Sequence, residues 1–178
     1  MIWESWYWKQ PLLDMAARLR LLKTGRRRLT EKRSVELERD IFIGFYSIRK
    51  ILDGVTRVTD ATRAVQIQLS WYPNRAEVNW HNNHRIDKLY DLESVNQETR
   101  DLEFINGKII HSFIFMPYVT DKGRLDGIFF TSDRDKQNKL YSMTIDTVIA
   151  VFERVGNDDP NSVHWEKHPD GKETFTIT

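Results

Sequence analysis

The chain has 178 residues, of which 40% are hydrophobic, 30% charged and 12% aromatic. This length suits one domain with a substantial core, and this composition excludes a chain that is disordered throughout or embedded in a membrane. The sequence contains no cysteine, which excludes disulfides, thiol nucleophiles and cysteine-ligated zinc. We therefore predict a single domain over residues 1–178.

The N-terminal residues, MIWESWYWKQ, lack the cationic segment and uninterrupted apolar run of a secretion signal. No apolar run approaches the roughly 20 residues of a membrane span. We therefore expect a cytoplasmic protein with no membrane span.

The net charge of +1 hides an asymmetry along the chain. Residues 1–60 contain 13 lysines and arginines against 8 acidic residues, whereas residues 61–178 contain 14 against 18. This asymmetry indicates either an anionic partner or attraction between the two parts of the folded chain.

Two helices are predicted in the first 54 residues. The first follows Pro11 and ends near Gly25, and the second begins at the capping residue Thr30 and ends near Gly54. The segment IFIGFY, residues 41–46, is apolar on nearly every side, so we expect other elements to cover it. The helical spacing of the first helix comes from Leu12, Leu13, Ala16, Leu19 and Leu22.

A sheet is predicted to begin near residue 64, where apolar and polar residues start to alternate. After a turn at Pro73-Asn74, residues 77–80 are expected to return as a short partner strand. Residues 86–95 are ambiguous and allow a short helix. The alternating apolar residues of the first strand are Val65, Ile67, Leu69 and Trp71.

Asn106-Gly107 is the clearest local turn signal, because Asn-Gly is typical of the type I′ turns that join two strands. It predicts that residues 102–105 pair with the strand KIIHSFIFM, residues 108–116. A turn at residues 121–123 then leads to a strand over residues 125–131, which completes a meander.

The last part of the chain combines a helix and a hairpin in this interpretation. Residues 145–155 have helical spacing, with Thr144 as the cap and Gly156 as the end, although a strand is the alternative. A turn at residues 168–171 is expected to join residues 163–166 with residues 174–177. The predicted class is α+β: a mostly antiparallel sheet of meander and hairpins, packed against two N-terminal helices (1–54) and one late helix (near 144–155), with the sheet-rich part over 64–178.

The densest charged feature is a basic segment between residues 18 and 33. Arginine side chains there could bind phosphate groups or acidic side chains in a bidentate manner. The alternative is a solvated loop whose cations pair with the acidic remainder of the chain. The candidate binding residues are Arg26, Arg27, Arg28, Lys32 and Arg33.

An aromatic cluster precedes this basic segment. We expect it to cover the core, because indole rings bury large areas; an interfacial membrane contact or a homodimer contact is the alternative use. The cluster consists of Trp3, Trp6, Tyr7 and Trp8.

Two sets of residues are candidates for chemistry. His81 and His84 have a spacing that suits two metal ligands, although a closed site needs a third. His111 is expected on the apolar face of a central strand, either as a hydrogen-bonded core residue or as a general base oriented by a carboxylate such as Asp126. Motifs typical of phosphate loops, zincins and hydrolase elbows are absent from the sequence.

These observations favour a non-enzymatic binding domain whose basic N-terminal helices contact an anionic partner, either nucleic acid or an acidic protein surface. No cofactor is predicted for that function. The alternative is a metal-dependent phosphoester or related hydrolase that uses histidine and aspartate residues with a divalent ion.

Overall fold

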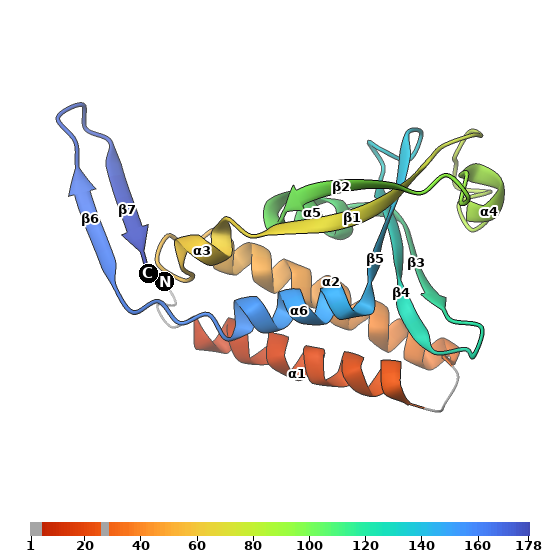
Figure 1. The fold of residues 1–178 in the computed structure, drawn as a ribbon, viewed down its shortest axis with the longest axis horizontal. Coiled ribbons are helices and arrows are strands. Elements are labelled where there is room, and N and C mark those ends of the chain that lie inside the picture. Colours follow the sequence, from red (N-terminus) through yellow and green to blue (C-terminus); the bar gives the residue numbers. More distant parts are fainter. Residues whose placement is uncertain (1–4, 26–28) are drawn as a thin grey trace.

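The computed structural model describes residues 5–25 and 29–178 of the chain. A five-stranded antiparallel sheet packs against a layer of helices, and a separate two-stranded hairpin follows at the C-terminus (Figure 1). The architecture is therefore α+β, as the sequence predicted. The helices are α1 (Trp6–Thr24), α2 (Glu31–Leu52), α3 (Asp60–Arg63), α4 (Ile86–Leu89), α5 (Leu102–Ile110) and α6 (Ile145–Gly156), and the strands are β1 (Gln66–Pro73), β2 (Asn96–Asp101), β3 (Ser112–Val119), β4 (Leu125–Ser132), β5 (Lys139–Thr144), β6 (Val163–Lys167) and β7 (Glu173–Ile177).

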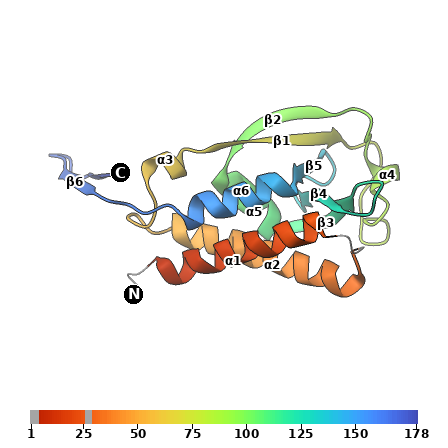
Figure 2. The ribbon, with the colours of Figure 1, turned by 60° about the horizontal axis from the view of Figure 1, so that its bottom comes forward.

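The two predicted N-terminal helices are confirmed. Helix α1 begins at Trp6, before Pro11, and the backbone N–H of Gly25 donates to a carbonyl of its last turn (2.9 Å). The hydroxyl of Thr30 accepts a hydrogen bond from the Arg33 N–H (3.4 Å) and so caps α2. Helices α1, α2 and α6 lie side by side beneath the sheet (Figures 1 and 2).

The sheet has the strand order β2-β1-β5-β4-β3, and all of its neighbouring strands are antiparallel. The meander is present, but it consists of β3, β4 and β5. The partner strand predicted over residues 77–80 is wrong, because this segment is a loop and β1 pairs instead with β2 and β5. The sequence of β2, NQETRD, has no apolar alternation, and this strand lies at the sheet edge with exposed and half-buried residues in alternation.

The predicted hairpin at Asn106-Gly107 is also wrong, because residues 102–110 form helix α5. The side chain of Asp101 caps this helix by accepting a hydrogen bond from the Phe104 N–H (2.8 Å). Among the described glycines only Gly123 and Gly171 have positive φ, so the Asn-Gly pair does not form a type I′ turn.

Tertiary packing explains why α5 forms in place of a hairpin. Three of its apolar residues recur at helical spacing with almost fully buried side chains, so burial of one helical face outweighs the local turn preference. Strand β3 consequently starts only at Ser112. The buried apolar residues of α5 are Leu102, Ile105 and Ile109.

The sheet separates two clusters of buried apolar residues. Neighbouring residues of β5 belong to different clusters, Tyr141 to the cluster against the helices and Leu140 to the cluster against residues 75–95. Because successive side chains of a strand point to opposite faces, each face of the sheet has a core of its own. The fully buried residues of the second cluster include Tyr90, which follows α4.

Tyr90 should make unfolding sensitive to alkaline pH. Burial raises the pKa of Tyr90, and its hydroxyl donates to the Lys136 carbonyl (2.6 Å). Since the folded-state pKa exceeds the unfolded value near 10, the stability that Tyr90 contributes is complete below about pH 10 and is lost as the pH rises further. We expect Tyr90→Phe to cost about 1 kcal/mol at pH 8, and this difference from wild type to shrink by pH 11 in urea unfolding. A constant difference across this range would contradict the prediction.

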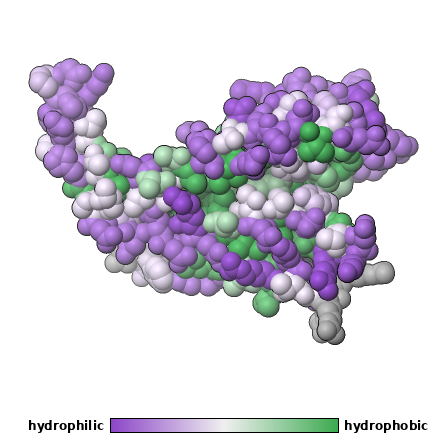
Figure 3. Space-filling model, in the orientation of Figure 1, coloured by the Kyte–Doolittle hydropathy of each residue, from purple (hydrophilic) through white to green (hydrophobic). Residues whose placement is uncertain are grey.

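The late helix and the last hairpin are confirmed. The hydroxyl of Thr144 accepts from the Thr147 N–H (3.2 Å), and α6 ends at Gly156. Strands β6 and β7 project from the body as an arm on which hydrophilic residues predominate (Figure 3). Within the described residues, no helix has the length and apolar composition that a membrane crossing requires.

Candidate functional site

The best-formed ion pair of the basic segment joins α1 to α2. The Nε and Nη2 atoms of Arg18 donate to the two carboxylate oxygens of Asp40, at 2.7 and 3.0 Å. The Asp40 side chain is 8% exposed and the Arg18 side chain is 50% exposed. The hydrogen bond to Asp40 raises the pKa of Arg18, and the pair links the two helices.

Two further cations of α1 pair with α6. Arg20 pairs with Glu153, with one N–O distance of 2.7 Å, and Lys23 pairs with Asp146. The basic first part of the chain and its acidic remainder therefore attract each other directly, as one interpretation of the charge asymmetry expected. These cations of α1 have acidic neighbours inside the molecule.

The predicted binding residues separate into two groups. Arg26, Arg27 and Arg28 lie outside the described residues. Lys32 and Arg33 lie in the first turn of α2, where Lys32 is exposed and Arg33 is half-buried. A cavity of 480 Å³ beside them, between the facing ends of α1 and α2, is lined by Arg18, Leu21, Leu22, Gly25, Arg33, Glu36 and Asp40.

The outward side of α2 combines apolar and cationic side chains. The exposed fraction is 61% for Val35 and 46% for both Ile43 and Tyr46. Three cations lie in the same row, and successive members of the row are three or four residues apart, so all six lie on one side of the helix. We call this surface the α2 face; it consists of Lys32, Val35, Arg39, Ile43, Tyr46 and Lys50.

The α2 face corrects the expectation that residues 41–46 are covered on every side. The opposite side of α2 is fully buried against the core, but Ile43 and Tyr46 are open to solvent. Phe42 lies at the border and packs edge-on against Phe115 of β3, with 5.0 Å between the ring centroids. The fully buried residues of α2 are Leu37, Ile41, Phe45, Ile48 and Ile51.

Acidic and basic residues flank the α2 face at opposite ends of the helix. Glu36 and Glu38 lie in its first half, and Arg49 lies in its last turn. Near the C-terminal end, Lys50 lies 3.7 Å from Asp53, and its Nζ is 5.7 Å from the centroid of the Tyr46 ring. Carboxylates therefore flank the first half of the α2 face and a cation flanks its C-terminal end, while Lys32 and Arg39 lie within the first half of the face itself.

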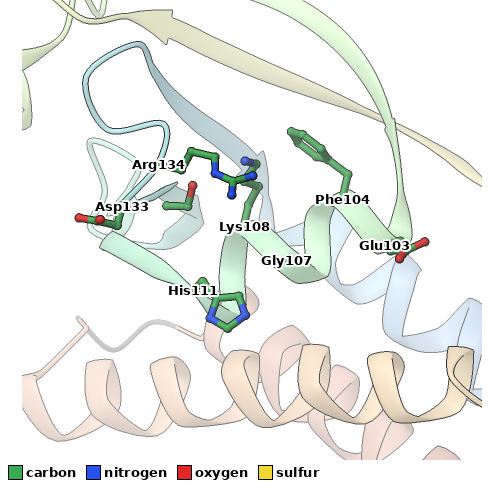
Figure 4. Close-up of a pocket in the computed structure, with 8 residues that line it drawn as sticks. Glu103, Phe104, Gly107, Lys108, His111, Asp133 and Arg134 are labelled. Atoms are coloured by element: carbon green, nitrogen blue, oxygen red, sulfur yellow. The ribbon is translucent and has the colours of Figure 1, made fainter.

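A second candidate site is a cavity of 530 Å³ between α5 and the turn after β4 (Figure 4). Lys108 forms an ion pair with Asp135, and its Nζ is 4.9 Å from the centroid of the Phe104 ring. The Lys108 cation therefore has both an acidic and an aromatic neighbour. The lining of the cavity consists of Glu103, Phe104, Gly107, Lys108, His111, Ser132, Asp133 and Arg134.

His111 is not the buried strand residue that the sequence predicted. It is exposed and forms the C-cap of α5, because the strand begins one residue later. It lines the cavity of Figure 4. Asp126 lies half-buried in β4. Burial of Tyr118, and to a smaller extent the charge of Asp126, raise the pKa of Tyr118 to about 12. No hydrogen bond between His111 and Asp126 occurs in the described part of the chain.

His81 and His84 lie in the loop before α4. The His84 ring nitrogen Nε2 accepts from Arg85 Nε at 3.3 Å, and the backbone N–H of His81 donates to Asn79. Over residues 5–25 and 29–178, no group of three or more histidine, aspartate or glutamate residues is placed to hold a metal ion. The two histidines thus remain without the third ligand that the metal hypothesis needs.

The predicted aromatic cluster is only partly buried. Trp8 packs against the core, but Trp6 and Tyr7 are 56% and 69% exposed, and Trp3 lies outside the described residues. On the C-terminal arm, Trp165 pairs with Phe175 across the two strands, and both rings remain partly exposed.

Comparisons with family models, with curated proteins and with solved structures give no match to this chain.

Proposed function

We propose that the chain is a non-enzymatic interaction domain that uses the α2 face to bind an acidic protein surface. The observation that carries this proposal is the row of exposed Val35, Ile43 and Tyr46, with Arg39 within the row and a lysine at each end. Exposed apolar side chains that lie together on one element are typical of partner-binding surfaces. The cations within this row and at its ends favour a partner with carboxylates around an apolar centre.

The side chains of this surface favour a protein partner over nucleic acid. Val35 and Ile43 are aliphatic and offer no ring on which a base could stack. Glu36 and Glu38 lie beside the row and would repel phosphates. An acidic amphipathic helix meets the aliphatic residues with leucines and, unlike a phosphate backbone with its regular charges, can place its glutamates on the cations and away from Glu36 and Glu38.

We expect a synthetic amphipathic helix with leucine and glutamate on one face to bind the protein, and binding to weaken with added salt. The double variant Arg39→Glu/Lys50→Glu should weaken this binding about tenfold or more, because both reversed charges then face carboxylates. Fluorescence anisotropy of the labelled peptide, at protein concentrations from below about 1 µM upward, measures the effect.

Two controls make this experiment specific. The variant Lys167→Glu/Lys172→Glu has the same change in charge at exposed sites near the tip of the β6–β7 arm, which projects away from the helices (Figure 1), and should bind as wild type does. A peptide with lysine in place of glutamate should not bind. Equal weakening by both double variants would show that net charge alone attracts the peptide, and tighter binding of a DNA duplex would favour a nucleic-acid partner instead.

A further inference from the structure

We infer that the partner of the α2 face is the same face of a second copy of this chain, packed antiparallel about a twofold axis near Ile43. This inference rests on the proposed use of the α2 face as an interaction surface, and the acidic groups that its cations meet are then Glu36 and Glu38 of the second copy. The evidence is the order of charges along α2, which makes the surface complementary to itself.

One edge of the α2 face has its charges at equal distances from Ile43. Glu36 lies seven residues before Ile43 and Lys50 lies seven residues after it. At a rise of about 1.5 Å per residue, each charge lies roughly 10 Å from the proposed axis. In an antiparallel twofold contact, residue i of one copy meets residue j of the other and the reverse, so Glu36 meets Lys50 of the second copy twice.

The opposite edge repeats this arrangement. Glu38 lies five residues before Ile43 and Arg49 lies six residues after it. Eleven residues are close to three helical turns of about 3.6 residues, so these two side chains share one edge. Fourteen residues are close to four turns, which likewise places Glu36 and Lys50 on one edge. The twofold rotation brings each edge of one copy against the same edge of the other copy. Two Glu36–Lys50 pairs and two Glu38–Arg49 pairs result, which makes four ion pairs.

The centre of the contact is apolar and aromatic. Ile43, 46% exposed, meets Ile43 of the second copy on the axis. Arg39 lies four residues before Ile43, and Tyr46 lies three residues after it. The Arg39 guanidinium of one copy therefore reaches the Tyr46 ring of the other copy. A parallel arrangement would instead bring opposite edges together, with Glu36 near Glu38 of the second copy and Lys50 near Arg49, which is unfavourable because the charges are alike.

The surface is open for such a contact. In Figure 2 the N-terminal half of α2 forms the lower right border of the molecule. Helix α2 has 22 residues and is therefore about 33 Å long. A contact made by one helix from each copy is at the small end of specific interfaces, so we expect a dissociation constant roughly in the micromolar range.

Charge reversal on one edge tests the register. In sedimentation velocity runs between about 1 and 200 µM, wild type should change from monomer to dimer. Glu36→Lys and Lys50→Glu should each remain monomeric, because each places like charges together twice. Mixing these two variants should restore a dimer, since the lysine introduced at position 36 of one copy then meets the glutamate introduced at position 50 of the other. Circular dichroism confirms that each variant is folded.

A single cysteine tests the position of the axis, because the natural chain contains none. Ile43→Cys should form a disulfide-linked dimer under mild oxidation, since two residues on the axis fall within the roughly 7 Å that a disulfide requires between Cα atoms. Val35→Cys is the matched control. Val35 is more exposed than Ile43, yet two copies of it should lie about 24 Å apart along the helix direction and should cross-link at least about tenfold more slowly.

The outcomes separate this inference from the proposed function. A wild type that stays monomeric, a dimer indifferent to both charge reversals, or equal cross-linking at residues 35 and 43 would each overturn the antiparallel dimer. If the acidic peptide still binds wild type, and this binding is lost in Arg39→Glu/Lys50→Glu, the α2 face remains an interaction surface for another acidic protein. Loss of peptide binding and of dimerisation together would refute both.

Discussion

Replacing Phe152 with alanine is expected to lower the free energy of unfolding by about 3 to 5 kcal/mol. The Phe152 side chain is fully buried, and its ring meets Phe45 of α2 edge-on with 5.4 Å between centroids. Removing it leaves a cavity where α6 packs against α2, and the surrounding helices can close that cavity only in part. Urea unfolding followed by circular dichroism measures the loss, provided that the slopes of the two transitions agree.

Phe175→Ala is the matched control for this prediction. Phe175 lies on the C-terminal arm and is 37% exposed, so its truncation should cost no more than about 1 kcal/mol. Similar losses for both variants would mean that the contact between α2 and α6 does not dominate stability.

Gly44→Ala is expected to destabilise the fold by about 1 to 3 kcal/mol, although alanine normally favours a helix over glycine. A Cβ atom added at Gly44 would lie 2.6 Å from the Cε2 atom of Phe152. Helices α2 and α6 must therefore separate, or the ring must leave its position. Unfolding in urea should show a lower midpoint with an unchanged slope.

Gly107→Ala provides a control of opposite sign in another helix. An added Cβ at Gly107 of α5 would meet no atom within 4 Å, so only the helix preference for alanine acts, and stability should rise by about 0.5 to 1 kcal/mol. The cost of Gly44→Ala should also shrink in a Phe152→Leu background, because the smaller side chain leaves room. Equal effects at both glycines would remove the steric explanation.

Local sequence signals were sufficient to predict an element where the residues of that element itself specify its ends or its turn. Thr30 and Thr144 cap α2 and α6 as predicted, because a capping hydroxyl acts within three residues. The last hairpin was also predictable, since Gly171 adopts the positive φ that its turn needs (83°).

The sequence was misleading where distant segments decide the structure. Asn106-Gly107 has strong turn chemistry, yet the pair lies within α5, because burial of that helix against the core contributes more than a two-residue turn. His111 was therefore misplaced as a core strand residue. Strand β2 has no apolar alternation to detect, and its strand form depends on pairing with β1.

For function, the sequence by itself determined that cations concentrate in the first 60 residues and acids in the remainder. Only the tertiary structure decided which of these cations face acids inside the molecule. Arg18, Arg20 and Lys23 pair with residues 22, 133 and 123 positions away, and pairing over such separations depends on how the helices pack. The same packing buries one side of α2 and leaves the other side exposed to solvent. The α2 face could therefore be identified only from the tertiary structure.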